Sequence, residues 1–369
     1  MSFELQATSR LGAASTRREG TTHIARGSRT VVAMATICGA VACASTSPTP
    51  PVTLCVDPRP TAPCRTATEV EGWLLRNDIE ILAAGAPSKG RQRTRILTLA
   101  VPDDDGRIVF RAKWRALSTS SSLNNPRAEL GAYAVERLAL QPHEYVVPPA
   151  RGHCFDLDQY REKVDSAERP SFARTRCVYG ILSYWLEGAL TPKRAEQIGW
   201  IRSKPYDAAL FARSPSYRQS VADTNVLAHL ISHGDAHPNQ FVVTGYGERP
   251  FLHLVDNSTS FTSFRNPSIE ARDDWSRIIV PALRRGLIDR LGALTAGQLN
   301  SLAVVDQYEL RNGILVATRR TPAMSNTWAG YRWQGDELQV GLTDDEIRQL
   351  RSRIEALVAR VAHGDTSVF

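Results

Sequence analysis

Two aspartates in polar segments are the first candidates for chemistry. Asp235 lies within His233–Gln240 (HGDAHPNQ), after an expected helix, and Asp256 ends the second of two short β-like runs that follow. An Asp in a tight loop can orient an acceptor hydroxyl, and an Asp at a strand end can hold a metal ion against phosphates. Asn239 and Gln240 add amide oxygens, which Mg²⁺ also accepts. The pattern predicts phosphoryl transfer, with Asp235 catalytic and with metal ligands drawn from Asp256, Gln240 and Asn239.

Lysine is scarce in this chain, which has 45 Lys and Arg residues of which only five are Lys. Lys113 falls in an expected strand, and Glu129 follows 16 residues later on an expected helix. A strand Lys paired with a helix Glu grips the α- and β-phosphates of ATP in kinases. Lys89, in the Gly-rich basic loop 85–93, is a further candidate for the phosphates. The order of these residues along the chain, from basic loop to metal Asp, predicts a nucleotide site.

The elements that must position these residues change character along the chain. The first part is expected to be rich in strands, and the remainder is expected to be mainly helical, which predicts a two-lobed α+β protein. Asn125 and Pro126 are a good N-cap and first helical residue. Expected elements are a helical or mixed segment Glu69–Ala84, a hairpin of Ile96–Val101 and Arg107–Trp114 joined by the turn Asp103–Gly106, helices Pro126–Leu140, Tyr217–Ser232 and Thr343–Ala362, and β-like runs Phe241–Thr244 and Phe251–Val255.

Several of these segments resemble the secretory-pathway kinases of the four-jointed and Golgi casein kinase type, and their bacterial secreted relatives. The segments are Asn125–Leu138 (NPRAELGAYAVERL) with Val146–Pro149 (VVPP), Leu254–Phe261 (LVDNSTSF) and Gly180–Leu186 (GILSYWL). The resemblance implies a protein-kinase-like fold, with an N-lobe over residues 69–147 and a helical C-lobe over 148–369. It also implies ATP with Mg²⁺ or Mn²⁺, the Lys113–Glu129 ion pair, Asp235 in catalysis and Asp256 on the metal.

Two departures from that family keep an alternative open. Gln240 stands five residues after Asp235, with Asn239 one position early, and Ser258 replaces the usual Gly after Asp-Asn. The first interpretation is transfer of the ATP γ-phosphate to a hydroxyl on a protein, a glycan or a lipid headgroup. The alternative is a degraded pseudokinase that binds or regulates. A third hypothesis is a zinc hydrolase that uses His233 and His237, with His253 or Asp256 as a distant ligand.

The N-terminal segment predicts a location outside the cytoplasm. Residues 31–42 form a small-apolar run that is preceded by arginines and ends at Cys43, as in a bacterial lipobox. Residues 1–42 therefore form an expected signal or disordered leader, and the Pro/Ser/Thr-rich segment 43–68 an expected linker. The prediction is a protein anchored to a bacterial membrane through a lipid on Cys43, or secreted.

The number of cysteines agrees with that location, and the net charge bears on the kind of partner. Beyond Cys43 there remain four cysteines, and their spacing favours the pairs Cys55–Cys64 and Cys154–Cys177, although three connectivities are open. Disulfides persist in oxidising compartments. The net charge of +7 falls to +4 without residues 1–42, which hold five Arg and two Glu, so we expect no nucleic-acid partner. A hydrophobic content of 42% and a charged content of 22% exclude disorder throughout and a polytopic membrane protein.

Overall fold

The computed structural model describes residues 53–54, 64–85, 94–104, 106–121, 124–202, 206–245, 250–325 and 329–369. All of them belong to one unit, Thr49–Phe369. The expected leader 1–42, Cys43, Cys55 and Lys89 lie outside the described residues. The lipid anchor, the Cys55–Cys64 pair and the role of Lys89 therefore stay predictions.

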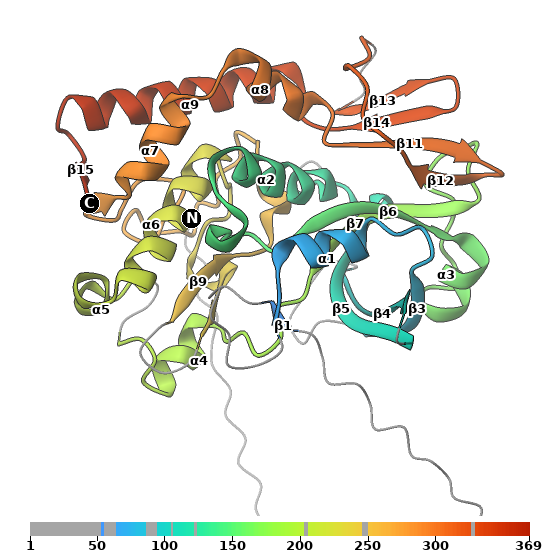
Figure 1. Cartoon of the computed structure of the whole chain (residues 1–369), viewed down its shortest axis with the longest axis horizontal. Coiled ribbons are helices and arrows are strands. Elements are labelled where there is room, and N and C mark those ends of the chain that lie inside the picture. The colour runs from blue at the N-terminus through green and yellow to red at the C-terminus, as the bar shows by residue number, and fades with distance from the viewer. Residues whose placement is uncertain are drawn as a thin grey trace, which may run out of the picture. The chain divides into compact units, whose positions relative to one another are not determined.

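A five-stranded antiparallel sheet carries Lys113. Its strands lie in the order β3 (Glu80–Gly85), β4 (Arg95–Asp103), β5 (Gly106–Ala116), β7 (Cys177–Tyr184) and β6 (Ala150–Asp156) (Figure 1). The expected hairpin is confirmed, since β4 and β5 pair from Asp103–Gly106 to Arg95–Trp114. Along β5, Phe110, Ala112 and Trp114 are buried, and the side chains between them turn to the other face of the sheet.

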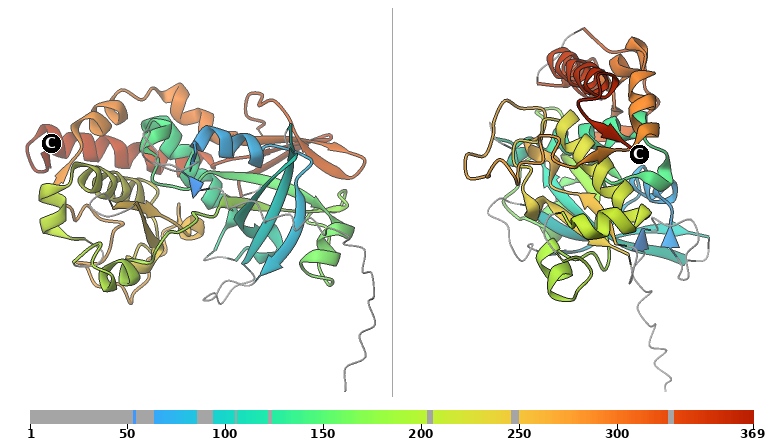
Figure 2. Two further views of the ribbon diagram at one scale, coloured as in Figure 1. Left: turned by 60° about the horizontal axis from the view of Figure 1, so that its bottom comes forward. Right: turned by 90° about the vertical axis from the view of Figure 1, so that its left-hand side faces the viewer.

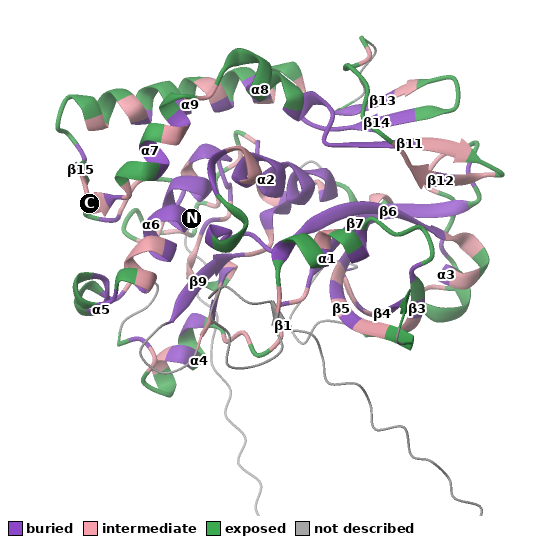
Figure 3. Cartoon of the chain, viewed as in Figure 1, coloured by how far each residue is buried: buried purple, intermediate pink, exposed green. Residues whose placement is uncertain are grey.

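Helix α2 (Pro126–Ala139) lies between this sheet and the helical part of the chain. Asn125 caps it, since its side chain accepts a hydrogen bond from Arg127 N, and Pro126 is its first residue, as expected. The helix contacts β6 and β7 on one side and α6 (Pro215–Leu230) and α7 (Arg285–Gly292) on the other. Most of its residues are buried (Figure 3), as in a helix enclosed by its neighbours. Two shorter helices, α1 (Ala67–Leu74) and α3 (Leu157–Lys163), also contact the sheet.

The helix-rich part follows β7 and holds the two expected β-like runs. These runs, β8 (Phe241–Thr244) and β9 (Phe251–Leu254), form an antiparallel pair against α6. Helix α9 (Asp344–Ala362) begins with the expected capping box of Thr343 and Glu346. No helix among the described residues is long and apolar enough to cross a membrane. Further short elements are α4 (Pro192–Gln197), α5 (Ala208–Arg213), α8 (Ala296–Asn300), and the parallel pairs β1 (Thr53–Leu54) with β2 (Cys64–Arg65) and β10 (Ala282–Leu283) with β15 (Ser367–Val368).

The prediction that residues 148–369 are mainly helical is wrong in two places. Strands β6 and β7 extend the first sheet to Tyr184, beyond the expected lobe boundary at 147. Every residue of β7 is buried, and such a run cannot be told from a buried helix by its periodicity. A second, four-stranded sheet has the order β12 (Ile314–Ala317), β11 (Asp306–Arg311), β14 (Glu337–Val340) and β13 (Tyr331–Gln334).

A turn signal for this second sheet was present in the sequence. Asn312 and Gly313 join β11 to β12 with φ of 50° and 81°, as in the Asn-Gly turns that favour hairpins. The segment Glu69–Ala84 is likewise divided, into α1 and β3. The described unit is thus α+β, with a strand-rich part followed by helices and a second sheet (Figure 2).

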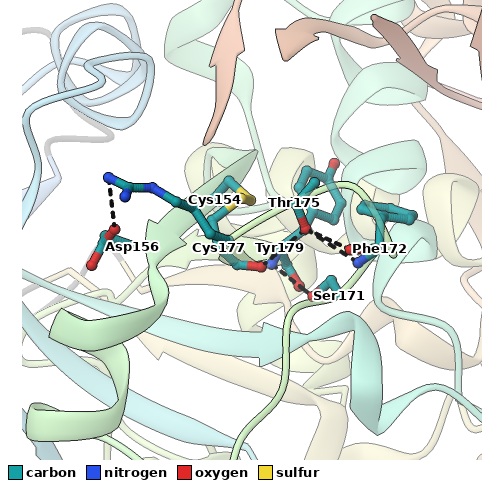
Figure 4. The surroundings of a disulfide bond; sticks show 8 residues. Cys154, Asp156, Ser171, Phe172, Thr175, Cys177 and Tyr179 are labelled. Carbon is teal, nitrogen blue, oxygen red and sulfur yellow. Dashed lines mark hydrogen bonds and ion pairs between the residues drawn. A yellow bond between two sulfur atoms is a disulfide. The ribbon is translucent and has the colours of Figure 1, made fainter. Parts of the chain in front are cut away.

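One expected disulfide joins the edge strand β6 of the five-stranded sheet to its neighbour β7. Cys154 of β6 and Cys177 of β7 are bonded, with their Cα atoms 5.5 Å apart (Figure 4). The chain between them returns to the sheet at Ser171, whose N–H donates to the Cys177 carbonyl at 3.1 Å. The Cys154–Cys177 prediction is confirmed as a contact of two buried cysteines.

Candidate functional site

Three cations lie on one face of β5 because side chains alternate along a strand. Residues 111, 113 and 115 share the face opposite Phe110, Ala112 and Trp114. Each cation meets a carboxylate from a different part of the chain, in the pairs Arg111–Glu187, Lys113–Glu129 and Arg115–Asp256. The second and third pairs form one network, which we call the site cluster: Lys113, Arg115, Glu129 and Asp256.

Lys113 and Glu129, which the sequence pairs, are in contact. Lys113 Nζ lies 2.5 Å from Glu129 Oε1, and the other carboxylate oxygen accepts a hydrogen bond from Asn257 N at 3.1 Å. The Glu129 side chain is 4% exposed and that of Lys113 is 15% exposed. Arg127 fixes the start of α2, since its guanidinium donates to Glu346 of α9 at 2.7 and 2.9 Å. Glu129 therefore joins strand, helix and the Asp256 turn.

Asp256 occupies the turn after β9 and faces both cations of the site cluster. Lys113 Nζ lies 3.3 Å from Asp256 Oδ1, and Arg115 donates to the same oxygen. Arg115 Nε is also 3.7 Å from Glu129 Oε1. Burial alone would raise the pKa of Asp256, but the charges of Lys113 and Arg115 hold it well below its ordinary value. The carboxylate is therefore ionised at neutral pH, and its side chain is 36% exposed.

Asp235 is held by side chains from its own loop and from a distant one. Gln240 Nε2 donates to Oδ2 at 2.8 Å, Asn266 Nδ2 donates to Oδ1 at 2.7 Å, and His237 Nε2 is 3.5 Å from Oδ2. Burial raises the pKa of Asp235, but the hydrogen bonds from His237, Asn266 and Gln240 lower it below its usual value. Asp235 is thus an oriented, ionised carboxylate.

The loops that carry Asp235 and Asp256 run side by side. Gly234 N donates to the Thr259 carbonyl at 3.0 Å, and Val255 N donates to the Gln240 carbonyl at 2.9 Å. A Cβ at position 234 would come within 2.7 Å of the Phe264 carbonyl oxygen, so the close approach of the loops requires Gly there. Three residues of these loops have left-handed backbone conformations, a feature that gathers at functional sites: Ser232, Asp256 and Phe261.

His233 is the buried residue between the two aspartates. Its Nδ1 accepts a hydrogen bond from Asp235 N at 3.2 Å, while Nε2 has no hydrogen-bond partner among the described residues. Burial lowers the pKa of His233, although the charges of Asp256 and Asp235 act in the opposite direction. The imidazole is therefore neutral at neutral pH, and its Nδ1 lies close to both loops, with Thr259 Oγ1 at 3.4 Å.

The expected metal ligands have separate partners in this conformation. Asp256 contacts Lys113 and Arg115, Gln240 turns its amide nitrogen to Asp235, and Asn239 is exposed. Among the residues that the structure describes, no group of three or more His, Cys, Asp or Glu side chains is arranged to hold a metal ion. As it stands, this donor set does not fit a divalent cation, which needs several oxygens directed at one point.

The three imidazoles of the zinc hypothesis are engaged by other residues, and His233 and His237 both contact Asp235. Nε2 of His253, on β9, is 2.8 Å from Thr244 Oγ1, and His237 lies next to Asp235. Burial lowers the pKa of His253 to about 3. These contacts describe a buried strand histidine and a loop histidine, and the zinc hypothesis gains no ligand set from them.

Two residues of the site were not predicted. Arg115 follows Lys113 by two positions on the same strand, so the period-two pattern places it on the same face. That signal was available, but it was hidden among the many arginines. Asn266 bonds Asp235 from 31 residues away, and no local pattern indicates such a contact.

No protein-family model matches the chain, and no curated protein matches it significantly. The α+β unit and its cluster of paired charges are therefore the basis for a functional conclusion.

Proposed function

We propose that this chain is a kinase-like phosphotransferase, which moves the γ-phosphate of ATP to a hydroxyl acceptor. The observation that carries the proposal is the contact of Lys113 on β5 with Glu129 on α2, with Asp256 directly beside them. A Lys held by a helix Glu is the arrangement that grips nucleotide phosphates in kinases. The adjacent Asp235 loop supplies the second requirement, an ionised carboxylate fixed by hydrogen bonds.

Each residue has a distinct part in the proposed reaction. Lys113 and Arg115 offset the negative charge of the phosphates. Asp235 orients the acceptor hydroxyl, whose oxygen attacks the γ-phosphorus. The bond from the γ-phosphorus to the β–γ bridging oxygen breaks, and ADP leaves with its electron pair. The hydroxyl proton passes to Asp235 and then to solvent.

A second candidate is a binding or regulatory pseudokinase on the same site. Two contacts favour it: Arg115 donates to Asp256, and the Gln240 amide nitrogen donates to Asp235. In an active kinase these side chains would be directed at the nucleotide instead.

The proposed acceptor is a hydroxyl on a protein, a glycan or a lipid headgroup. A lipid anchor at Cys43 and an extracytoplasmic location belong to this proposal as well.

The test compares ATP binding with ADP formation in four proteins: the wild type, Lys113→Met, Asp235→Asn and Lys193→Met. Lys193 is an exposed residue of α4 and serves as the matched control. We expect Lys113→Met to weaken ATP binding at least about tenfold, which is a loss of about 1.4 kcal/mol. Asp235→Asn should keep binding but lower ADP formation by about 10²-fold or more with peptide, glycan or lipid acceptors.

The outcomes separate the two candidates. Binding that depends on Lys113 without ADP formation in any protein would support the pseudokinase and exclude transfer to those acceptors. An unchanged ATP affinity in Lys113→Met, or no ATP binding by the wild type, would contradict both candidates. Lys193→Met should behave as the wild type in both measurements.

A further inference from the structure

The four charges of the site cluster balance one another in the absence of a ligand. Glu129 and Asp256 bring two negative charges, and Lys113 and Arg115 bring two positive charges within 4 Å of them. Arg115 is 8% exposed, so its charge is held away from water by these contacts. In a site that uses a divalent ion, the second carboxylate would meet the metal. In this chain it meets a guanidinium.

We propose that Arg115 takes the place of a divalent cation beside Asp256, so that the site binds the triphosphate of a nucleotide without metal. This inference rests on the proposed nucleotide site and goes beyond it by naming the residue that sets metal dependence. The chain supplies the second positive charge itself, on the strand that also carries Lys113.

The position of Arg115 suits phosphate binding. Alternate residues of a strand lie about 6–7 Å apart on one face, so Lys113 and Arg115 can meet different phosphate groups of one nucleotide. A guanidinium pairs with phosphate through the same parallel N–H donors that it uses for a carboxylate. Asp256 is the most exposed member of the cluster, so a ligand that arrives from solvent meets the Arg115–Asp256 contact first.

A metal ion at Asp256 would have to displace this arrangement. The ion would bring two positive charges next to Lys113 and Arg115, and repulsion between like charges at such distances is strong in a partly buried site. Moving Arg115 away would leave a buried guanidinium without the carboxylate that now offsets its charge. Arg115 therefore competes directly with a divalent cation for Asp256.

The test is calorimetric titration of ATP into the folded protein, once in excess EDTA and once in excess Mg²⁺, with the ratio of the two dissociation constants as the readout. The variants are Arg115→Met, which removes the charge, and Arg115→Lys, which keeps it. Arg111→Met is the matched control, because Arg111 lies on the same face of β5 but pairs with Glu187. Circular dichroism of each variant checks that it is folded.

For the wild type we expect the dissociation constants in EDTA and in Mg²⁺ to agree within about threefold. Arg115→Met should bind ATP at least about tenfold more weakly in EDTA than in Mg²⁺, because the metal must now supply the missing charge. Arg115→Lys should fall between these ratios, and Arg111→Met should keep the wild-type ratio.

Three results would overturn the proposal in distinguishable ways. Wild-type binding that requires Mg²⁺, or an Arg115→Met ratio equal to that of the wild type, would refute the role of Arg115 and leave the nucleotide site intact. The absence of ATP binding in both conditions, for the wild type and for Arg115→Met, would refute the nucleotide site and this inference with it.

Discussion

The molecule contains two networks with the same charges and different surroundings. The site cluster joins two cations to two carboxylates at the turn after β9. A second network, which we call the helix cluster, does so between α6 and α7. Arg284 Nε donates to Asp223 at 3.0 Å, and Arg290 lies 2.8 Å from Glu144. The members of the helix cluster are Asp223, Glu144, Arg284 and Arg290.

The pKa values of the two aspartates are shifted in opposite directions. The Asp223 side chain is 0% exposed, and burial raises its pKa to about 7, with Arg284 acting against this shift and Glu144 adding to it. For Asp256 burial acts in the same sense, but Lys113 and Arg115 outweigh it and lower the pKa. Lys113 and Arg115 therefore keep the partly exposed carboxylate of Asp256 ionised, whereas Arg284 and Arg290 do not offset the desolvation of the buried Asp223.

This difference agrees with the proposal that the site cluster, and not the helix cluster, is the functional site. The helix cluster joins α6, α7 and the segment before β6, and it has the burial of a structural network. The site cluster leaves its Asp accessible, beside a second loop with an oriented carboxylate. Both networks contain an Asp with a shifted pKa, so a shifted pKa alone does not distinguish a functional site from a structural network. The exposure of the Asp side chain does.

The largest expected effect is the loss of the central cation of the helix cluster. Arg284→Met leaves Asp223 and Glu144 buried beside each other with only Arg290, so we expect a loss of about 3–5 kcal/mol in the free energy of unfolding. Arg115→Met removes a cation from the site cluster, but Lys113 and solvent remain next to Asp256. Its loss should be about 1–2 kcal/mol. Urea denaturation at pH 8 measures both, and equal losses would remove the distinction between the networks.

The next effect is a pH dependence of opposite sign in the two networks. Asp223 has a raised pKa, so the folded state binds more protons than the unfolded state between about pH 4 and about pH 7. The free energy of unfolding should therefore fall as the pH rises through this window. Asp223→Asn removes this contribution, and its stability relative to the wild type should rise across the window by about 2–4 kcal/mol.

Asp256→Asn is the matched variant for that measurement. The pKa of Asp256 is lowered, so its contribution to stability is present above about pH 4 and is lost as the pH falls below that value. The difference from the wild type should thus change at acid pH and stay level from pH 5 to 8. A flat difference for Asp223→Asn between pH 4 and 7 would show that burial does not control this carboxylate.

The sequence predicted the contact of Lys113 with Glu129 better than it predicted the sheets. Lys113 and Glu129 were found because each lies on an element with a clear local signal, a strand in a hairpin and a capped helix. The contact of Arg115 with Asp256, and that of Asp235 with Asn266, depend on how distant loops pack, and no single segment encodes them. Strand β7 was missed because both of its faces are buried, which removes the period-two pattern.

The smallest expected effect concerns the backbone of the Asp256 turn. In this turn the residue with positive φ is Asp256 itself, at 61°, and Ser258 is not among the described residues with positive φ. A Gly at 258 therefore offers no conformational relief. The Ser258 hydroxyl lies 3.4 Å from Asp256 Oδ1, and the Ser258 carbonyl accepts a hydrogen bond from Asn125 N at 2.8 Å. We expect Ser258→Gly to lower the free energy of unfolding by about 0.5–1 kcal/mol.

ATP affinity should change less than about twofold in this variant, because the cations that face Asp256 are unaltered. Ser258→Ala is the control, since it removes the same hydroxyl but keeps the backbone restricted, and it should lose less stability than Ser258→Gly. Denaturation and ATP titration of both variants measure these effects. A clear gain in ATP affinity for Ser258→Gly alone would mean that a stiff turn limits the site. The exposure of the Asp256 side chain would then depend on the backbone of the turn rather than on Lys113 and Arg115.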